Sequence, residues 1–385
     1  MSAPAKNYFE ESLAFHKAHS WKLETVSKAH ITTREDLSLA YTPGVAAPCL
    51  AIAKNPEDAY LYTLKSNTVA VISDGSAVLG LGNIGALAGL PVMEGKCVLF
   101  KEFAWVNAFP IILATQDTEE IIQTIKNIAP TFGGINLEDF SAPRCFEIEE
   151  RLKAELDIPV MHDDQHGTAI VALAGLINSL KITGKKKEEV RIVINGPGAA
   201  GTAILKLFRL WGIRDIIACD SKGALSSSRT DLNAEKQKLV TISNPRNISG
   251  TLQDAIRGAD VFVWVSAPNA LTTEDVRTMA PDAIIFAMAN PIPEIMPDDA
   301  RAGGARIIAT GRSDFPNQLN NVLVFPGVFK GALKYRFTKI TDEMKLAAAE
   351  ALAAYVTNPT EDMIIPNPLD KNVVDVVAES VGRFR

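Results

Sequence analysis

The stretch "VRIVINGPGAAGTAILKLFRLWGIRDIIACD", residues 190–220, contains every part of one unit of a doubly wound sheet. An apolar run leads directly into a glycine-rich turn, an amphipathic segment follows, and a second apolar run closes on Asp220. This order predicts a strand, a crossover helix that ends at Gly212, and a second strand whose terminal acid takes the ribose hydroxyls of a dinucleotide. Because a helix N-terminus attracts anions, we expect the pyrophosphate on the backbone amides of the turn. The turn residues are Gly196, Gly198, Ala199, Ala200 and Gly201.

The same glycine spacing, G-x-G-x-x-G, occurs earlier in "GLGNIG", residues 80–85. The apolar run "TVAVIS", residues 68–73, lies too far upstream to lead into that turn. The glycine and proline within 89–91 are expected to end any following helix after about two turns. We read "CVLF", residues 97–100, as a strand followed by Glu102 in the place of the ribose acid. Because this crossover is too short, we predict a tight turn that meets a substrate or the nicotinamide.

Short apolar strands alternate with helical segments from residue 68 to the end of the glycine unit and beyond it. Such alternation is typical of α/β domains with parallel sheets, and 385 residues are too many for one ordinary core. We predict an N-terminal α/β domain over 1–165 and a doubly wound Rossmann-type domain over 166–385. The first sixty residues or so are expected to form helices, one of them capped by Thr33. The alanine-rich helix after Lys339 is expected to pack back on the body.

The composition is that of a globular protein, with 47% apolar and 22% charged residues and a net charge of −6. Basic and acidic residues are interleaved, so we expect no nucleic-acid partner. No apolar run reaches the roughly eighteen residues that span a bilayer, and the N-terminus lacks the pattern of a signal peptide. The four cysteines are widely spaced and fit reduced thiols, which favours the cytoplasm.

Four carboxylates follow two neighbouring strand candidates. Glu138 and Asp139 end "GGINL", Asp163 and Asp164 end "IPVM", and the amphipathic segment 144–156 lies between them. If that segment is the crossover of a parallel βαβ unit, both pairs emerge at one edge of the sheet. Like charges so close together need a cation or must hold protons. Oxygen ligands alone favour magnesium or manganese over zinc.

Two other interpretations of this region remain open. His162 and His166 match H-x-x-x-H, the pattern of a zinc-binding helix. The first histidine ends a strand, however, and we expect the helix to begin only at Thr168, so the two would not share a helical face. The acids could also be helix caps in an ordinary solvated loop.

Several long segments, taken together, make the chain resemble the malic enzymes of the short-subunit bacterial kind, over nearly its whole length. The segments are "AYTPGVAAPCL", "AVLGLGNIGALAGLPVMEGK", "FGGINLEDFSAPRCFEIE", "HDDQHGTAIVALAGL", "FAMANPIPEI" and "ATGRSDFPNQLNNVLVFPGVFKGAL". The likeness extends to the N-terminal part of longer malic enzymes that carry a phosphotransacetylase-like domain. It implies oxidative decarboxylation of L-malate to pyruvate and carbon dioxide, reduction of NAD or NADP, a Mg²⁺ or Mn²⁺ ion, and a homodimer or a larger homo-oligomer.

The resemblance also assigns roles to residues. It places the metal on Glu138, Asp139 and Asp164, with Asp163 beside them rather than among the ligands. It makes Lys96 the base that takes the malate hydroxyl proton, once burial and a nearby cation lower its pKa, and Tyr41 the acid that protonates the enolate. From the sequence alone, Lys96 would be a solvated lysine at a strand start, and Tyr41 a core aromatic. The resemblance adds three asparagines at the substrate or nicotinamide: Asn290, Asn320 and Asn321.

The chain departs from the family pattern in two places. Trp105 and Asn107 stand where relatives more often have glycine and aspartate, so the packing and charge there are expected to differ. Ala77 stands where the long-subunit relatives place an arginine that binds substrate. We therefore expect backbone amides of the turn around Gly82 to bind the malate carboxylate.

The choice between the two cofactors rests on the end of the second strand of the glycine unit. Asp220 normally selects NAD through the ribose hydroxyls. Lys222, two residues further on, could meet a 2′-phosphate, and we therefore favour NADP over NAD.

Two rival functions stay open at this level. A metal-free dehydrogenase of similar two-domain build would have no use for "NLED" or "HDDQHG", and its activity would survive a chelator. A nicotinamide-binding sensor without catalytic activity would show no turnover with malate, metal and either cofactor.

Overall fold

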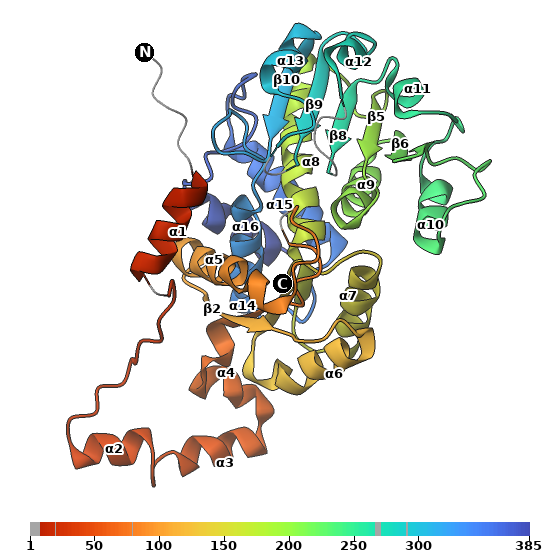
Figure 1. The fold of residues 1–385 in the computed structure, drawn as a ribbon. Helices are drawn as coiled ribbons and strands as arrows, with labels where there is room; N and C mark the ends of the chain where they lie inside the picture. The colour runs from red at the N-terminus through yellow and green to blue at the C-terminus, as the bar shows by residue number, and fades with distance from the viewer. Residues whose placement is uncertain (1–7, 20, 79, 266–270, 290–291) are drawn as a thin grey trace.

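A computed structural model describes residues 8–19, 21–78, 80–265, 271–289 and 292–385. Two parallel sheets lie in opposite halves of the body, and α8, Asp163–Thr183, runs lengthwise between them (Figure 1). The two-domain α/β class predicted from the sequence is therefore confirmed. The division near residue 165 stays a prediction. No described helix is long and apolar enough to cross a membrane.

The first sheet contains four parallel strands in the order β2-β1-β3-β4. β1 is buried along its whole length, as expected for a strand covered on both faces. The strands are β1 Thr68–Ser73, β2 Asn107–Ile112, β3 Gly134–Leu137 and β4 Val160–His162. The helices between them are α5 Ala86–Ala104, α6 Thr118–Ile128 and α7 Arg144–Glu155.

The second sheet has the order β10-β9-β8-β5-β6-β7, and only the short β7 runs antiparallel. The chain enters at β5, builds β6 on one side and then continues from β8 on the other, so a topological switch point lies beside β5. The strands are β5 Arg191–Asn195, β6 Asp215–Asp220, β7 Gly223–Ala224, β8 Val261–Trp264, β9 Ala283–Ala287 and β10 Ala305–Thr310. The helices are α9 Ala199–Trp211, α10 Ala234–Ile242, α11 Leu252–Ile256, α12 Thr273–Arg277 and α13 Pro297–Ala302.

Three C-terminal helices pack back on the body, and they include the alanine-rich helix predicted after Lys339. They are α14 Phe325–Lys334, α15 Asp342–Tyr355 and α16 Asn372–Gly382. α15 packs on α8, while α14 and α16 pack on each other and on α5. The rings of Phe100 and Phe325 lie 4.8 Å apart at the α5–α14 contact. The C-terminal segment therefore joins the same core as the first sheet.

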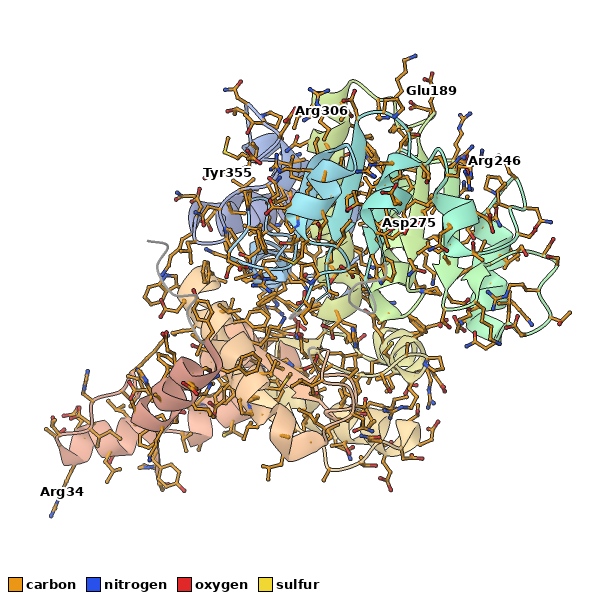
Figure 2. The ribbon with its side chains drawn as sticks, turned by 45° about the horizontal axis from the view of Figure 1, so that its top comes forward. Arg34, Glu189, Arg246, Asp275, Arg306 and Tyr355 are labelled. Atoms are coloured by element: carbon orange, nitrogen blue, oxygen red, sulfur yellow. The ribbon has the colours of Figure 1, made fainter. Side chains whose placement is uncertain are left out.

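The N-terminal helices form an arm that projects from the body, with α2 and α3 at its far end (Figure 1). The helices are α1 Tyr8–His19, α2 Arg34–Ala40, α3 Ala46–Lys54 and α4 Ala59–Tyr62. Thr33 and Asp36 form a capping box at the start of α2, so the predicted cap is confirmed. None of the residues in these four described helices is buried. Arg34 lies at the tip of the arm in Figure 2.

The reading of residues 97–100 as a strand was wrong, because they belong to α5. This helix runs through Pro91 and ends only at Ala104, where Trp105 adopts a left-handed conformation (φ 59°). Glu102 therefore lies on a helix and cannot take the place of a ribose acid. The crossover after the first glycine turn is a full helix, so its assumed shortness no longer separates the two glycine motifs. The distance between the glycine turn and the strand before it still separates the two motifs, because β1 already ends at Ser73.

Candidate active site

Acidic side chains meet at the carboxyl edge of the first sheet. β3 and β4 are adjacent and parallel, with Leu137 opposite His162, so the residues that follow both strands emerge side by side. Carboxylate oxygens of Glu138, Asp139 and Asp164 all lie within 4.8 Å of one another. The predicted clustering of acids from the two strands is therefore present.

Two of these three carboxylates are held in place by nearby amides. Asn136 Nδ2 donates to Glu138 Oε2 at 2.9 Å, and the backbone N–H of Asp139 donates to Asp164 Oδ2 at 2.8 Å. Burial raises the pKa of Glu138 well above its usual range, and the neighbouring Asp164 adds to that rise although Lys96 opposes it. A partly buried set of three carboxylates offers only oxygen ligands, which suits a hard divalent cation.

Lys96 projects from α5 to the edge of this cluster. Its Nζ lies 2.6 Å from Asp163 Oδ2 and 2.8 Å from Glu138 Oε1, and it also lies 4.3 Å from the centre of the Phe325 ring. Burial alone would lower the pKa of Lys96, but the carboxylates of Asp163 and Glu138 outweigh it and hold this pKa above its ordinary value. The expected lowering toward neutrality is therefore not seen with both carboxylates facing the amine.

Asp163 is fully buried and forms an ion pair with Lys96, and it is not one of the three carboxylates of the cluster. Its Oδ2 also accepts a hydrogen bond from Asn321 Nδ2 at 3.1 Å, and Asn321 in turn contacts Thr168. α8 begins at Asp163, so the expected start at Thr168 was wrong. Gly167 lies within this helix, and it must be glycine because a Cβ at this position would sit 1.9 Å from Asp163 Oδ1.

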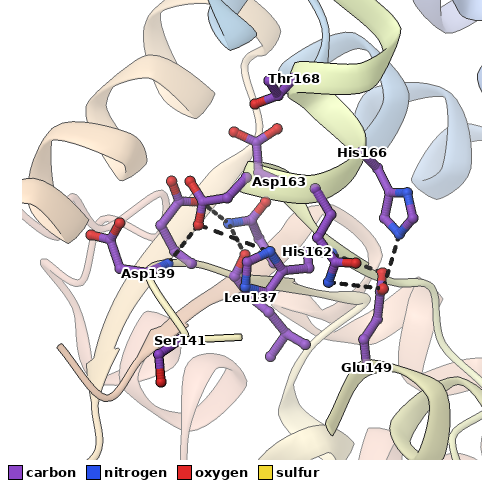
Figure 3. Close-up of polar contacts among 12 residues, drawn as sticks. Leu137, Asp139, Ser141, Glu149, His162, Asp163, His166 and Thr168 are labelled. Atoms are coloured by element: carbon purple, nitrogen blue, oxygen red, sulfur yellow. Dashed lines mark hydrogen bonds and ion pairs between the residues drawn. The ribbon is translucent and has the colours of Figure 1, made fainter. Parts of the chain in front are cut away.

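The two histidines of the alternative zinc site face different partners. His162 Nδ1 lies 3.9 Å from Asp164 Oδ2. His162 precedes α8 and is fully buried, while His166 Nε2 lies 2.9 Å from the carboxylate of Glu149 (Figure 3). Among the described residues, the only group of acids, histidines and cysteines close enough to hold a metal is the three-carboxylate cluster. All four cysteines are free, and three of them are buried.

The asparagines predicted at the substrate occupy different environments. Asn321 faces Asp163, as described above. Asn320 uses its side-chain oxygen to accept from the N–H of Val322, which caps the short 3₁₀ helix Asn321–Leu323. Asn290 lies outside the described residues.

The first glycine motif forms a tight turn between β1 and α5. Gly82 has φ 76°, and its carbonyl accepts from the N–H of Val78 at 3.0 Å. A Cβ on Gly75 would sit 2.3 Å from the carbonyl of Gly85, which shows how closely the two ends of the turn approach. The N–H of Ala77 donates to the carbonyl of Asp139, so the turn is tied to the acid cluster.

The departures at Trp105 and Asn107 lie away from this edge. Trp105 is 73% exposed, and Asn107 begins β2, at the amino end of the sheet. Lys101 donates to Asn107 Oδ1 at 2.9 Å. Neither residue therefore belongs to the acid cluster.

Tyr41 does not lie at the acid cluster of its own chain. It follows α2 on the projecting arm, and it is 67% exposed. Neither the predicted proximity to Lys96 nor the alternative of a core aromatic is observed within one chain.

The second glycine motif has the geometry expected of a dinucleotide-binding turn. Gly196 follows β5 directly and has φ 98°, and a Cβ on Gly201 would sit 2.1 Å from the carbonyl of Gly196. α9 spans Ala199–Trp211, and Gly212 is its C-cap, so the predicted end of the helix at this glycine is confirmed. A cavity of about 310 Å³ lies in front of the turn, lined in part by Gly198.

Two basic residues that the sequence interpretation missed surround Asp220. Arg229 Nη1 lies 2.7 Å from Asp220 Oδ1, and Lys236 Nζ lies 2.6 Å from Oδ2. Burial raises the pKa of Asp220, but hydrogen bonds from Arg229 and Lys236 outweigh it and hold the pKa below its usual range. Lys222 instead pairs with Asp231 at 2.7 Å and is 68% exposed. The sequence signal for this group was two basic residues that follow β6, but their spacing from Asp220 matches no simple motif.

Comparison with known proteins places both halves of the chain. Residues 20–153 match the N-terminal domain of malic enzymes, and residues 165–382 match the malic enzyme NAD binding domain. The chain is 56% identical to the bifunctional malic/malolactic enzyme of Bacillus subtilis, over 97% of this chain and 92% of that one. It is 59% identical to the NAD-dependent malic enzyme of Geobacillus stearothermophilus, over 94% and 76%. The crystal structure of the NAD-dependent malic enzyme of Thermotoga maritima superposes with a TM-score of 0.94 at 50% identity, covering 96% of this chain and 98% of the other.

Proposed function

The chain belongs to the malic enzyme family, and on this basis we propose how its own side chains convert L-malate, with NAD or NADP, into pyruvate and carbon dioxide. The observation that carries the proposal is one ammonium, that of Lys96, held within 2.8 Å of both Glu138 and Asp163 at the edge of the acid cluster. The carboxylates of Glu138, Asp139 and Asp164 would hold Mg²⁺ or Mn²⁺. When bound there, such a cation would polarise the C2 oxygen and stabilise the charge that develops on it as carbon dioxide leaves.

Lys96 is the base in this proposal. Hydride moves from C2 of malate to the nicotinamide, while the amine takes the hydroxyl proton, and the C3–carboxylate bond then breaks to leave an enolate. Lys96 must first lose its own proton, which Glu138 and Asp163 now help it to retain. Glu138 also belongs to the metal set, so a cation bound there competes for one of the two charges that stabilise the ammonium.

Tyr41 protonates C3 of the enolate from a second copy of the chain. The arm that carries it exposes many large apolar side chains, more than an isolated soluble chain leaves to water. Its exposed residues include Phe9 at 75%, Leu13 at 74%, Leu39 at 71%, Leu50 at 71% and Leu61 at 73%. In a twofold dimer each arm can lie on the partner's body and deliver its tyrosine there. The chain thus acts as a homo-oligomer whose active site is shared.

A complementation assay tests this arrangement. Tyr41→Phe and Lys96→Met are each expected to be inactive. After the two variants are unfolded together and refolded, random pairing makes about half of the dimers mixed, and one of the two sites in each mixed dimer is intact. Recovery of about a quarter of wild-type activity supports a shared site. No recovery, with mixed dimers demonstrated by mass spectrometry, contradicts it.

Other residues bind the rest of the substrate and the cofactor. Amides of the turn around Gly82 bind a malate carboxylate, and Asn320, Asn321 and Asn290 meet the substrate or the nicotinamide. The turn at 196–201 binds the pyrophosphate. Arg229 and Lys236, already placed around Asp220, favour a 2′-phosphate, so NADP is the preferred cofactor.

One assay tests the reaction as a whole. Reduced cofactor is followed at 340 nm with L-malate and NADP or NAD in parallel, with and without Mn²⁺. Metal-dependent turnover that yields pyruvate is expected with both cofactors and is faster with NADP. Turnover that survives chelation would favour a metal-free dehydrogenase, and no turnover at all would favour a sensor.

A further inference from the structure

Another buried carboxylate, that of Glu149, lies outside the acid cluster and contacts the segment that carries Asp164. Glu149 projects from α7, is 5% exposed and receives four donors. Lys153 Nζ lies 2.6 Å away, and the backbone N–H of His162 donates at 3.0 Å. The other two donors are His166 Nε2 at 2.9 Å (Figure 3) and Gln165 Nε2 at 3.4 Å.

Three of these four donors flank the two aspartates that face Lys96 and the acid cluster. His162 ends β4, and Gln165 and His166 lie in the first turn of α8, so a single carboxylate fastens the chain on both sides of Asp163 and Asp164. The attachment includes a backbone amide, so it fixes the path of the main chain as well as the side chains. An anion at the N-terminus of α8 is also stabilised by the helix dipole.

The negative charge of Glu149 is stabilised by its neighbours. Burial would raise its pKa, but His166 and Lys153 outweigh that and hold the pKa well below its usual range. A carboxylate so deeply buried is stable only while its donors stay in place. The bonds therefore oppose any rotation of the β4–α8 junction.

The direction of that junction decides whether the acid cluster forms. Asp164 Oδ2 must reach the N–H of Asp139, at 2.8 Å, and bring its carboxylate within 4.8 Å of Glu138. The Asp164 side chain is partly exposed to solvent, so packing alone does little to fix its position beside Glu138 and Asp139. The hydrogen bonds of Glu149 supply the constraint from the buried side.

We propose that Glu149 is a positioning residue of the metal site, which holds the β4–α8 junction so that Asp164 meets Glu138 and Asp139. This inference rests on the proposed function, because it takes the three carboxylates as the metal ligands. Glu149 itself touches neither the metal ligands nor the reacting groups. Its removal is expected to weaken metal binding first, and turnover only as a consequence.

The test measures metal binding directly in the full chain, without malate or cofactor. Free Mn²⁺ is followed by electron paramagnetic resonance for the wild type, Glu149→Gln, Glu149→Asp and Glu150→Gln. Glu150 is the adjacent residue of α7 and is exposed, so its variant is the matched control. The dissociation constant of Mn²⁺ is expected to rise at least about tenfold in Glu149→Gln, less in Glu149→Asp, and less than about twofold in Glu150→Gln.

Two further measurements separate positioning from other roles. At saturating Mn²⁺, kcat of Glu149→Gln is expected to recover to near the wild-type value, because the ligands themselves are intact. A lowered Tm with an unchanged Mn²⁺ dissociation constant, in Glu149→Gln or in the milder Glu149→Asp, would show that Glu149 only fastens α7 to α8 and would overturn the inference. Asp164→Asn separates the two proposals: if it binds Mn²⁺ as tightly as the wild type, the proposed metal site itself is wrong.

Discussion

Replacing Lys236 with alanine should change the affinity for NADP far more than that for NAD. The ammonium lies 2.6 Å from Asp220 Oδ2, and the residue lines the cavity in front of the dinucleotide turn. A 2′-phosphate brings a charge of about −2 to this position and would take over the hydrogen bond that Asp220 now accepts. A hydrogen bond to a charged group contributes about 1.5–3 kcal/mol, which corresponds to an increase of about 10- to 150-fold in the NADP KM. NAD carries no such phosphate, and Arg229 still pairs with Asp220, so the NAD KM should change by less than about threefold.

The assay is initial-rate kinetics at saturating malate and Mn²⁺, with each cofactor varied in turn. Lys238→Ala is the matched control, because Lys238 lies two residues further along α10, is 71% exposed and pairs with Glu235 at 2.7 Å. Its KM values should stay at those of the wild type. An equal loss of affinity for NADP and NAD in Lys236→Ala, or no loss for NADP, would refute the assignment of this residue to the 2′-phosphate.

Three further changes test other parts of the site. Lys96→Met removes the base and leaves two buried carboxylates unpaired, so turnover should fall between about 100- and 10,000-fold, and the unfolding free energy of the metal-free protein should fall by about 3 kcal/mol in urea titrations. Gly82→Val places a side chain at φ 76° and should raise the malate KM about tenfold, but not the NADP KM, if the turn amides bind the carboxylate. Lys222→Ala removes an exposed ion pair with Asp231 and should leave the NADP KM within about threefold, which would remove the sequence-based reason for choosing NADP.

The parts of the fold that follow local rules were predictable. The unit β5-α9-β6 could be identified from its glycines, its amphipathic helix and its terminal Asp220, because each part is specified by residues within one short stretch. The meeting of Glu138 with Asp164 was also predictable, since two consecutive parallel strands joined by a right-handed crossover must end at the same edge.

The two helices that carry Lys96 and Asp164 were misjudged for a common reason. α5 packs against β1, β2, α14 and α16, so it is apolar on most sides and shows little helical periodicity. In α8, glycine is required at position 167, because a Cβ there would sit 1.9 Å from Asp163 Oδ1, whereas a Cβ on Gly89 in α5 would make only an ordinary contact, 3.6 Å from Gly75 Cα. Both glycines look like helix breakers in the sequence, but packing against other elements stabilises the helices that contain them.

The chemistry of the site depends on the same distant contacts. Lys96 and Asp163 are 67 positions apart, and Asp163 and Asn321 are 158 apart, so no spacing rule could reveal that one aspartate connects the amine to the C-terminal half. Resemblance to a family could identify Lys96 and Tyr41 as reactive, but it could not say which chain supplies each of them. In the dimer that we propose, the exposed apolar side chains of the arm become buried against the partner, and Tyr41 is carried with them. If the arm's apolar faces are what drive association, then dimer formation and completion of the active site are the same event, and activity per chain should fall on dilution in step with dissociation of the dimer.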